Sequence, residues 1–175
     1  MGIVNVTPDS FYDGGRYSTQ EQAVAHALRL VEEGADIIDV GGESTRPFSE
    51  PVSVSEELDR VIPVIKEIRA RSDVFISVDT YRADVADAAV EAGADMINDV
   101  YALSFDGNMA SVAAERRVPV VLMHMQGTPR DMQRAPRYDC EGGVLGHIVA
   151  FLADRIAYAV DAGIAEEDII VDPGI

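Results

Sequence analysis

The sequence has little positive charge and almost no cysteine, and each shortage excludes a class of function. Its 175 residues include 14 lysines and arginines against 31 aspartates and glutamates, a net charge of −17. We therefore expect no binding to nucleic acid through a basic face. The single cysteine, Cys140, cannot form an internal disulfide, which fits a reducing cytoplasm.

Long apolar runs are also missing. No stretch of ~18 consecutive apolar residues occurs, so we expect no membrane-spanning segment. The first residues lack the basic segment and long apolar segment of a secretory signal. A hydrophobic content of 47% is enough for a core. The length predicts a single domain, because domains usually contain ~100–200 residues.

One sequence pattern recurs at residues 33–40 and 92–100, and more loosely at 162–172. In each copy a glycine lies where a helix needs a left-handed terminating residue, and an apolar strand follows. The first two copies are 59 residues apart. That distance accommodates two βα units of about 30 residues each.

Six short apolar runs alternate with helical patterns and predict strands at 3–6, 36–40, 74–78, 96–100, 119–123 and 169–171. Runs that are apolar on both faces belong in a parallel sheet covered by helices. A (β/α)₈ TIM barrel gathers all its strand ends at one mouth, whereas a doubly wound open sheet gathers only those near its switch point. Because every run ends in a polar residue, the α/β class with a TIM barrel is favoured, with about six of the eight βα units present.

The helical patterns carry further signals. Capping boxes predict helix starts at Ser18 and Ser53, and Pro63 should kink or shorten the second helix. One face of the last helix is predicted to be apolar through Leu145, Ile148, Val149, Leu152, Ile156 and Val160.

The polar strand ends are the candidate site: Asn5, Asp39, Asp79, Asn98 or Asp99, His124 and Asp172. The carboxylates of Asp79 and Asp172 with the amide of Asn98 suit a heterocycle edge that presents several N–H groups, such as a 2-aminopyrimidinone. Asn5 offers a neutral oxygen to Mg²⁺. Met123 can pack against a flat ring, although methionines at strand ends are commonly core residues.

Two loops follow the first strands. In the second, Gly41 and Gly42 allow backbone to approach a ligand, and the Thr45 hydroxyl and Arg46 guanidinium match phosphate oxygens. Ordinary βα loops have the same composition, so each loop alone leaves both interpretations open. No nucleophile elbow is present, and covalent catalysis has no support.

Together these segments resemble the dihydropteroate synthases, the folate-pathway enzymes that sulfonamides inhibit. The matching motifs keep the family's order: 5–11 with 13–15, 41–47, 77–80, 98–100, 123–129 and 172–174. The resemblance implies that 6-hydroxymethyl-7,8-dihydropterin diphosphate condenses with 4-aminobenzoate, by a dissociative route, to give dihydropteroate and pyrophosphate. It implies one pterin-binding barrel domain over residues 1–175, incomplete at its C-terminus, which in complete form is a cytoplasmic homodimer.

The resemblance also implies roles for individual residues. Asp79, Asn98 and Asp172 would hold the pterin, with Met123 along its ring. Asn5 would ligate Mg²⁺ on the diphosphate, which Thr45 and Arg46 would bind. The aminobenzoate site would be formed by Phe11, Asp13, Thr45, Pro47 and Phe48, and the catalytic residues would be Asn5, Asp13 and Arg46.

Three points qualify the resemblance. Phe48 replaces the glycine usual after the Arg-Pro pair, which bears on sulfonamide affinity more than on catalysis. The family continues past the position of Ile175 into two further strands with additional cations. Two alternatives stay open: a pterin-binding methyltransferase barrel, which has no diphosphate to bind, and an inactive partial barrel with two unpaired sheet edges.

Overall fold

The computed structural model describes residues 1–7, 16–43, 52–127, 137–139 and 142–174, with the backbone alone for 16–19. Six parallel strands form one sheet in the order of the sequence: β1 (Gly2–Asn5), β2 (Ile37–Gly41), β3 (Phe75–Asp79), β4 (Met96–Asp99), β5 (Val120–Met123) and β6 (Ile169–Asp172). The predicted strands are confirmed to within one residue at each end. A doubly wound sheet reverses its strand order, so the unbroken order 1 to 6 is that of a (β/α)₈ barrel.

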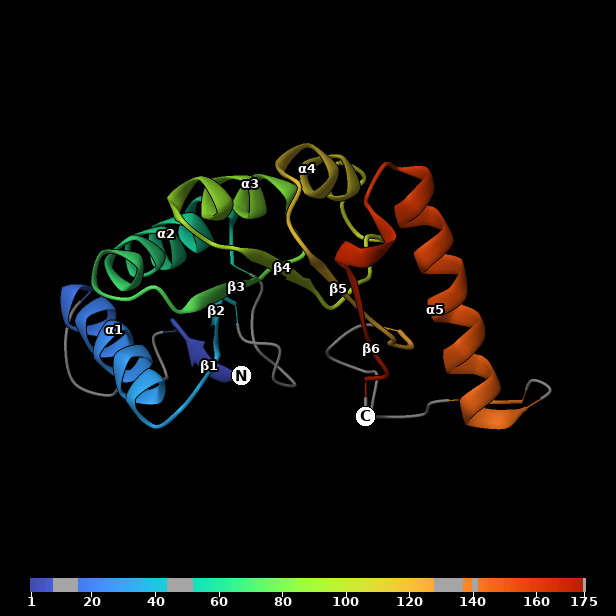
Figure 1. The fold of residues 1–175 in the computed structure, drawn as a ribbon, viewed down its shortest axis with the longest axis horizontal. Helices are drawn as coiled ribbons and strands as arrows, with labels where there is room; N and C mark the ends of the chain where they lie inside the picture. Colours follow the sequence, from blue (N-terminus) through green and yellow to red (C-terminus); the bar gives the residue numbers. More distant parts are fainter. Residues whose placement is uncertain (8–15, 44–51, 128–136, 140–141, 175) are drawn as a thin grey trace.

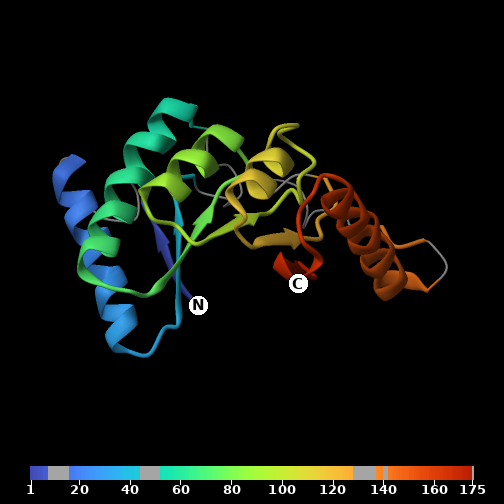
Figure 2. The ribbon, with the colours of Figure 1, turned by 45° about the horizontal axis from the view of Figure 1, so that its top comes forward.

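Helices follow the strands: α1 (Arg16–Glu32), α2 (Val54–Arg71), α3 (Ala83–Ala92), α4 (Met109–Arg116), α5 (Gly143–Asp161) and the short 3₁₀ helix η2 (Glu166–Asp168). Figures 1 and 2 show that α1 to α5 lie along the outer, convex side of a curved sheet. The core lies between these layers, where Val40, Ile65, Ile76 and Ile97 are fully buried.

Burial along β1 tells which side chains face away from the helices. Gly2 and Val4 are buried, whereas Ile3 and Asn5 are exposed. Side chains alternate between the two faces of a strand, and Val4 belongs to the core against the helices. Ile3 and Asn5 therefore face the concave side of the sheet.

The recurring glycines behave as predicted. Gly34, Gly93 and Gly163 have φ of 101°, 116° and 98°. These are left-handed values that side chains with a Cβ rarely adopt. The three glycines end helices shortly before β2, β4 and β6. The repeated sequence pattern is therefore a repeated α-to-β turn, as predicted.

The predictions for the helix ends and the proline have mixed outcomes. Ser53 caps α2, where its Oγ accepts a hydrogen bond from the Glu56 N–H at 3.2 Å, as predicted. The prediction at Ser18 is wrong, because α1 already begins at Arg16. Pro63 does not shorten α2. Proline leaves the carbonyl four residues earlier without its helical donor, and the Gln20 side chain of α1 donates to that carbonyl, on Asp59, at 3.1 Å.

Helix α5 is less buried than its pattern predicts. Leu152 and Ala159 are buried, but Leu145, Val149 and Val160 are 72%, 58% and 43% exposed, so the apolar face of α5 is covered only in part. By length and composition alone, α5 is apolar and long enough to cross a membrane, which is weak evidence for a span. Arg155 interrupts its apolar sequence and donates to the Ala102 carbonyl at 2.7 Å, which ties α5 to the loop after β4.

Candidate functional site

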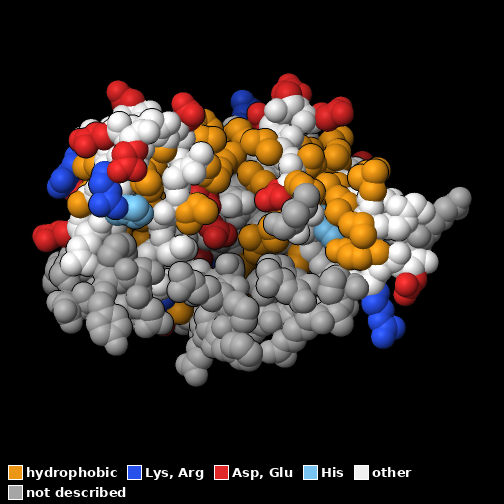
Figure 3. Space-filling view, turned by 90° about the horizontal axis from the view of Figure 1, so that it is seen from below, with side chains coloured by type: hydrophobic (Ala, Val, Ile, Leu, Met, Phe, Trp, Pro, Cys, Tyr) orange, Lys and Arg blue, Asp and Glu red, His pale blue; other side chains and the backbone are white. Residues whose placement is uncertain are grey.

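A row of residues crosses the first four strands near their carboxyl ends. The strand register pairs Asn5 with Gly41, Gly41 with Asp79, and Asp79 with Asn98. A Cβ on Gly41 would lie 3.3 Å from Asp79 Oδ2 and 3.6 Å from Asn5 Oδ1. Gly41 therefore leaves space between a carboxylate and an amide, as a ligand site requires. In Figure 3, which looks from below toward the concave side, acidic side chains lie among hydrophobic ones.

Asp79 is electrostatically unusual. Burial, followed by the negative charges of Asp39, Glu57, Asp99 and Glu43, raises its pKa from 3.8 to about 8. At neutral pH the free protein therefore holds Asp79 mainly as the neutral acid. A ligand that brings N–H donors or positive charge to this carboxyl group favours its ionised form. A strongly raised pKa at a strand end is typical of a functional group.

Asp39 belongs to the site, although the sequence analysis singled it out only as a strand end. It is 5% exposed, and its Oδ2 accepts a hydrogen bond from Asn98 Nδ2 at 3.2 Å. Its Oδ1 is buried with no hydrogen-bond partner among the described residues. Burial raises the pKa of Asp39, and the nearby Ser77 and Asn98 side chains partly offset this rise. Because Asn98 uses its N–H₂ group on Asp39, its Oδ1 is left to accept from a ligand.

Met123 of β5 and Asp172 of β6 are register partners. Met123 lies two residues beyond Val121, the register partner of Asn98 on β4. Asp172 Oδ1 accepts from the Gly174 N–H at 2.8 Å, which leaves the other carboxylate oxygen for a ligand. Gly174 has φ of 68°, and a Cβ there would overlap the His124 carbonyl oxygen. The sequence Asp172-Pro173-Gly174 is thus a turn that positions a carboxylate.

The structure corrects the predicted role of Gly42 and decides between Asn98 and Asp99. Gly42 was expected to let backbone approach a ligand, but a Cβ there would lie 2.7 Å from Val61 Cγ2 and 2.9 Å from Glu57 Cγ. Gly42 therefore allows close packing of α2. Of the two candidates on β4, Asp99 accepts hydrogen bonds from the N–H groups of Tyr101 and Leu103, both at 2.8 Å, so it shapes the following loop and Asn98 faces the site.

His124, one of the polar strand ends in the candidate site, has a structural role. It is 3% exposed, its Nε2 lies 3.1 Å from His147 Nδ1, and its ring packs edge-on to Phe151. His147 is half-buried. The remaining predicted site residues lie outside the described residues: Phe11, Asp13, Thr45, Arg46, Pro47 and Phe48.

The chain is similar to known proteins over its whole length. A family model described as pterin binding enzyme matches residues 1–175. The dihydropteroate synthases of Bacillus subtilis and Escherichia coli are 51% and 50% identical to it, over 100% and 99% of this chain but 58% and 60% of theirs. The solved structure of Xanthomonas albilineans dihydropteroate synthase with 4-aminobenzoic acid is 54% identical, covers 99% of this chain and 60% of that one, and has a TM-score of 0.90. The chain thus spans about three fifths of the length of these relatives.

Proposed function

Since the chain belongs to the pterin-binding enzyme family, we propose that the protein containing it is a dihydropteroate synthase. The reaction joins 6-hydroxymethyl-7,8-dihydropterin diphosphate to the amine of 4-aminobenzoate and releases pyrophosphate. The observation that carries the proposal is the row of Asn5, Asp79 and Asn98 at one register across β1, β3 and β4. A related solved structure contains 7,8-dihydropteroate, the product of this reaction.

The pterin edge suits the buried part of this row. A 2-amino-4-oxopterin presents adjacent N–H donors, and the Asp79 carboxylate accepts two of them when ionised. Asn98 accepts through its Oδ1, because its Nδ2 is held by Asp39. Asp172 accepts through its remaining oxygen, and Met123 packs along the ring. These four residues account for recognition of the heterocycle.

The diphosphate belongs beside Asn5, at the exposed end of the row. Mg²⁺ prefers oxygen ligands and usually keeps one or two protein ligands beside phosphate oxygens and water. The Asn5 amide oxygen, exposed at the end of β1, fits that requirement. Bound there, the ion would neutralise charge on the leaving diphosphate. Thr45 and Arg46 are proposed to bind the diphosphate itself, and they stabilise the departing anion while the pterin carries the developing positive charge.

The remaining assignments follow the same proposal. Phe11, Asp13, Thr45, Pro47 and Phe48 form the aminobenzoate site, and Asn5, Asp13 and Arg46 are the catalytic residues. Residues 1–175 contribute six units to one barrel domain, in a protein that acts in the cytoplasm as a homodimer, without nucleic acid or membrane. The small-molecule partners are the pterin diphosphate and 4-aminobenzoate.

The experiment measures pyrophosphate release by the complete protein that contains these residues, with and without 4-aminobenzoate. Release that requires both substrates and Mg²⁺ supports the proposal, and Asp79→Ala should abolish binding of the pterin diphosphate. Asp87→Ala, an exposed carboxylate on α3 paired with Arg116, is the matched control and should leave activity unchanged. Methyl transfer from methyltetrahydrofolate without pyrophosphate release would instead establish the methyltransferase alternative.

A further inference from the structure

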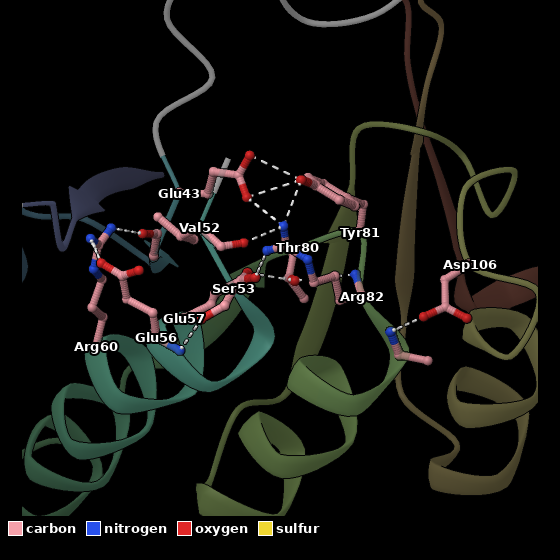
Figure 4. Close-up of polar contacts among 12 residues, drawn as sticks. Glu43, Val52, Ser53, Glu56, Glu57, Arg60, Thr80, Tyr81, Arg82 and Asp106 are labelled. Carbon is pink, nitrogen blue, oxygen red and sulfur yellow. Dashed lines mark hydrogen bonds and ion pairs between the residues drawn. The ribbon is translucent and has the colours of Figure 1, made fainter. Parts of the chain in front are cut away.

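Arg82 makes more contacts than an ordinary residue at the start of a helix. It precedes α3 and follows β3 by three residues. Its guanidinium forms ion pairs with Glu57 of α2 and, at 2.8 Å, with Glu43 after β2. It also donates to the Val52 carbonyl oxygen at 2.9 Å (Figure 4). One side chain therefore joins three segments of the chain.

Two of those contacts flank the same loop. Glu43 is the last described residue before residues 44–51, and Val52 is the first after them. Arg82 thus contacts the residues on both sides of residues 44–51. The start of the loop is held a second time, because Arg60 of α2 donates to the Gly42 carbonyl oxygen at 2.8 Å.

The residues around Arg82 hold its guanidinium in place. Glu57 is 1% exposed and accepts a hydrogen bond from Thr80 Oγ1 at 2.7 Å. The Tyr81 hydroxyl lies 2.9 Å from both carboxylate oxygens of Glu43. Burial, and then its hydrogen bond to Glu43, raise the pKa of Tyr81 above its usual value, so it remains a donor at all working pH values. The planar guanidinium can serve this many acceptors in fixed directions, which the point charge of a lysine cannot.

We infer that Arg82 is a positioning residue, which fixes Glu43 and Val52, the residues on either side of residues 44–51, relative to Asp79. Its link to Asp79 is the short segment of residues 80–82 between β3 and α3. What the loop binds rests on the proposed function, in which Thr45 and Arg46 hold the diphosphate. Arg82 also offsets the charges of Glu43 and Glu57, which would otherwise repel an anion beside this loop.

The chain offers a matched control in Arg69. This arginine also links several segments, through hydrogen bonds to the carbonyl oxygens of Gly93 and Val74 and an ion pair with Asp95. Those contacts lie before β3 and β4, at the opposite ends of the strands from Glu43 and Val52. Loss of either guanidinium should lower stability, but only loss of Arg82 should affect ligand binding.

The test compares Arg82→Met, Arg82→Lys and Arg69→Met in the complete protein. Calorimetry measures affinity for inorganic pyrophosphate with Mg²⁺ and for 6-hydroxymethylpterin, which has no phosphate. In Arg82→Met, pyrophosphate affinity should fall by about 10- to 100-fold, the scale of a ligand group misplaced by about 1 Å, and 6-hydroxymethylpterin affinity should change less than about threefold. Arg82→Lys should recover only part of the loss. Arg69→Met should leave both affinities unchanged.

Equal loss of both affinities in Arg82→Met, or no loss of either, would overturn the inference. If Arg82→Met does not fold, Glu43→Gln replaces it and should weaken the binding of pyrophosphate selectively. Backbone hydrogen exchange separates this inference from the proposed function. If the wild-type protein binds neither ligand, the proposed function fails, but hydrogen exchange still tests the positioning role. Exchange at residues 42–43 and 52–56 must be faster in Arg82→Met (or in Glu43→Gln) than in wild type. In Arg69→Met it must be unchanged.

Discussion

The side-chain amide of Asn98 donates to the buried carboxylate of Asp39 over 3.2 Å, although the two residues stand on β4 and β2 with β3 between them. This contact decides which atom of the Asn98 amide faces the ligand. A free amide can turn over and present either its donor or its acceptor. Asp39 removes that freedom, and in the proposed function the site is therefore selective for a ring that donates at this position.

Asp39→Asn should therefore weaken pterin binding without unfolding the protein. An asparagine at position 39 can donate to Asn98 as well as accept from it, so the amide of Asn98 is no longer held in one orientation. Loss of one oriented hydrogen bond of about 1–1.5 kcal/mol corresponds to roughly a tenfold loss of affinity. Calorimetric titration with 6-hydroxymethylpterin measures it, with Asp87→Asn as the exposed control. Unchanged affinity would mean that Asp39 does not orient Asn98.

Asp79→Asn should change how stability depends on pH. The pKa of Asp79 is about 8 in the folded protein, against 3.8 for an ordinary aspartate side chain. Between these values the folded state keeps a proton that the unfolded state has released, so wild-type stability falls as pH rises from about 4 to 8 and then levels off. Asparagine does not titrate, so the variant should gain in stability relative to wild type across this window. Urea unfolding at pH 5, 6, 7 and 8 measures the difference, and a constant difference would contradict the raised pKa.

Gly174→Ala should damage both stability and the site. Alanine would have to adopt the left-handed φ of Gly174, and its Cβ would overlap the His124 carbonyl oxygen. The conformational term alone costs about 1–2 kcal/mol, and the turn that holds Asp172 would shift. Thermal unfolding and pterin titration both measure the effect. Gly107→Ala is the control, because a Cβ there meets no atom within 4 Å, and it should change stability by less than about 0.5 kcal/mol.

Asn5→Ala should raise the Mg²⁺ concentration needed for half-maximal activity and leave the binding of 6-hydroxymethylpterin nearly intact. Asn5 is the exposed end of the row and has no assigned contact with the ring in the proposed function. Activity measured against Mg²⁺ and a pterin titration provide the two readouts. If both change equally, Asn5 has a structural role.

The strands and the strand-end residues were predictable because both depend on local patterns. An apolar run of four or five residues between helical patterns predicts β3 or β5 without reference to the rest of the chain. The contact of Asp39 with Asn98 was not predictable in this way, since it depends on barrel curvature over a separation of 59 residues. The role of Gly42 depends on how closely α2 packs, and nothing in its own neighbourhood in the sequence indicates that. Local patterns also do not show whether Leu145 and Val149 are buried, because their burial depends on which elements surround α5.

The left-handed glycines Gly34, Gly93 and Gly163 form similar turns before the amino ends of β2, β4 and β6. Each lies at an α-to-β junction, at the opposite end of the strands from the candidate site, and each has a left-handed φ. A segment from one such glycine to the next, such as 35–93, begins and ends in similar turns, so we expect that it can be exchanged between related barrels with little change to either turn. Recombination at these junctions therefore offers a way to vary the binding loops while the scaffold stays constant.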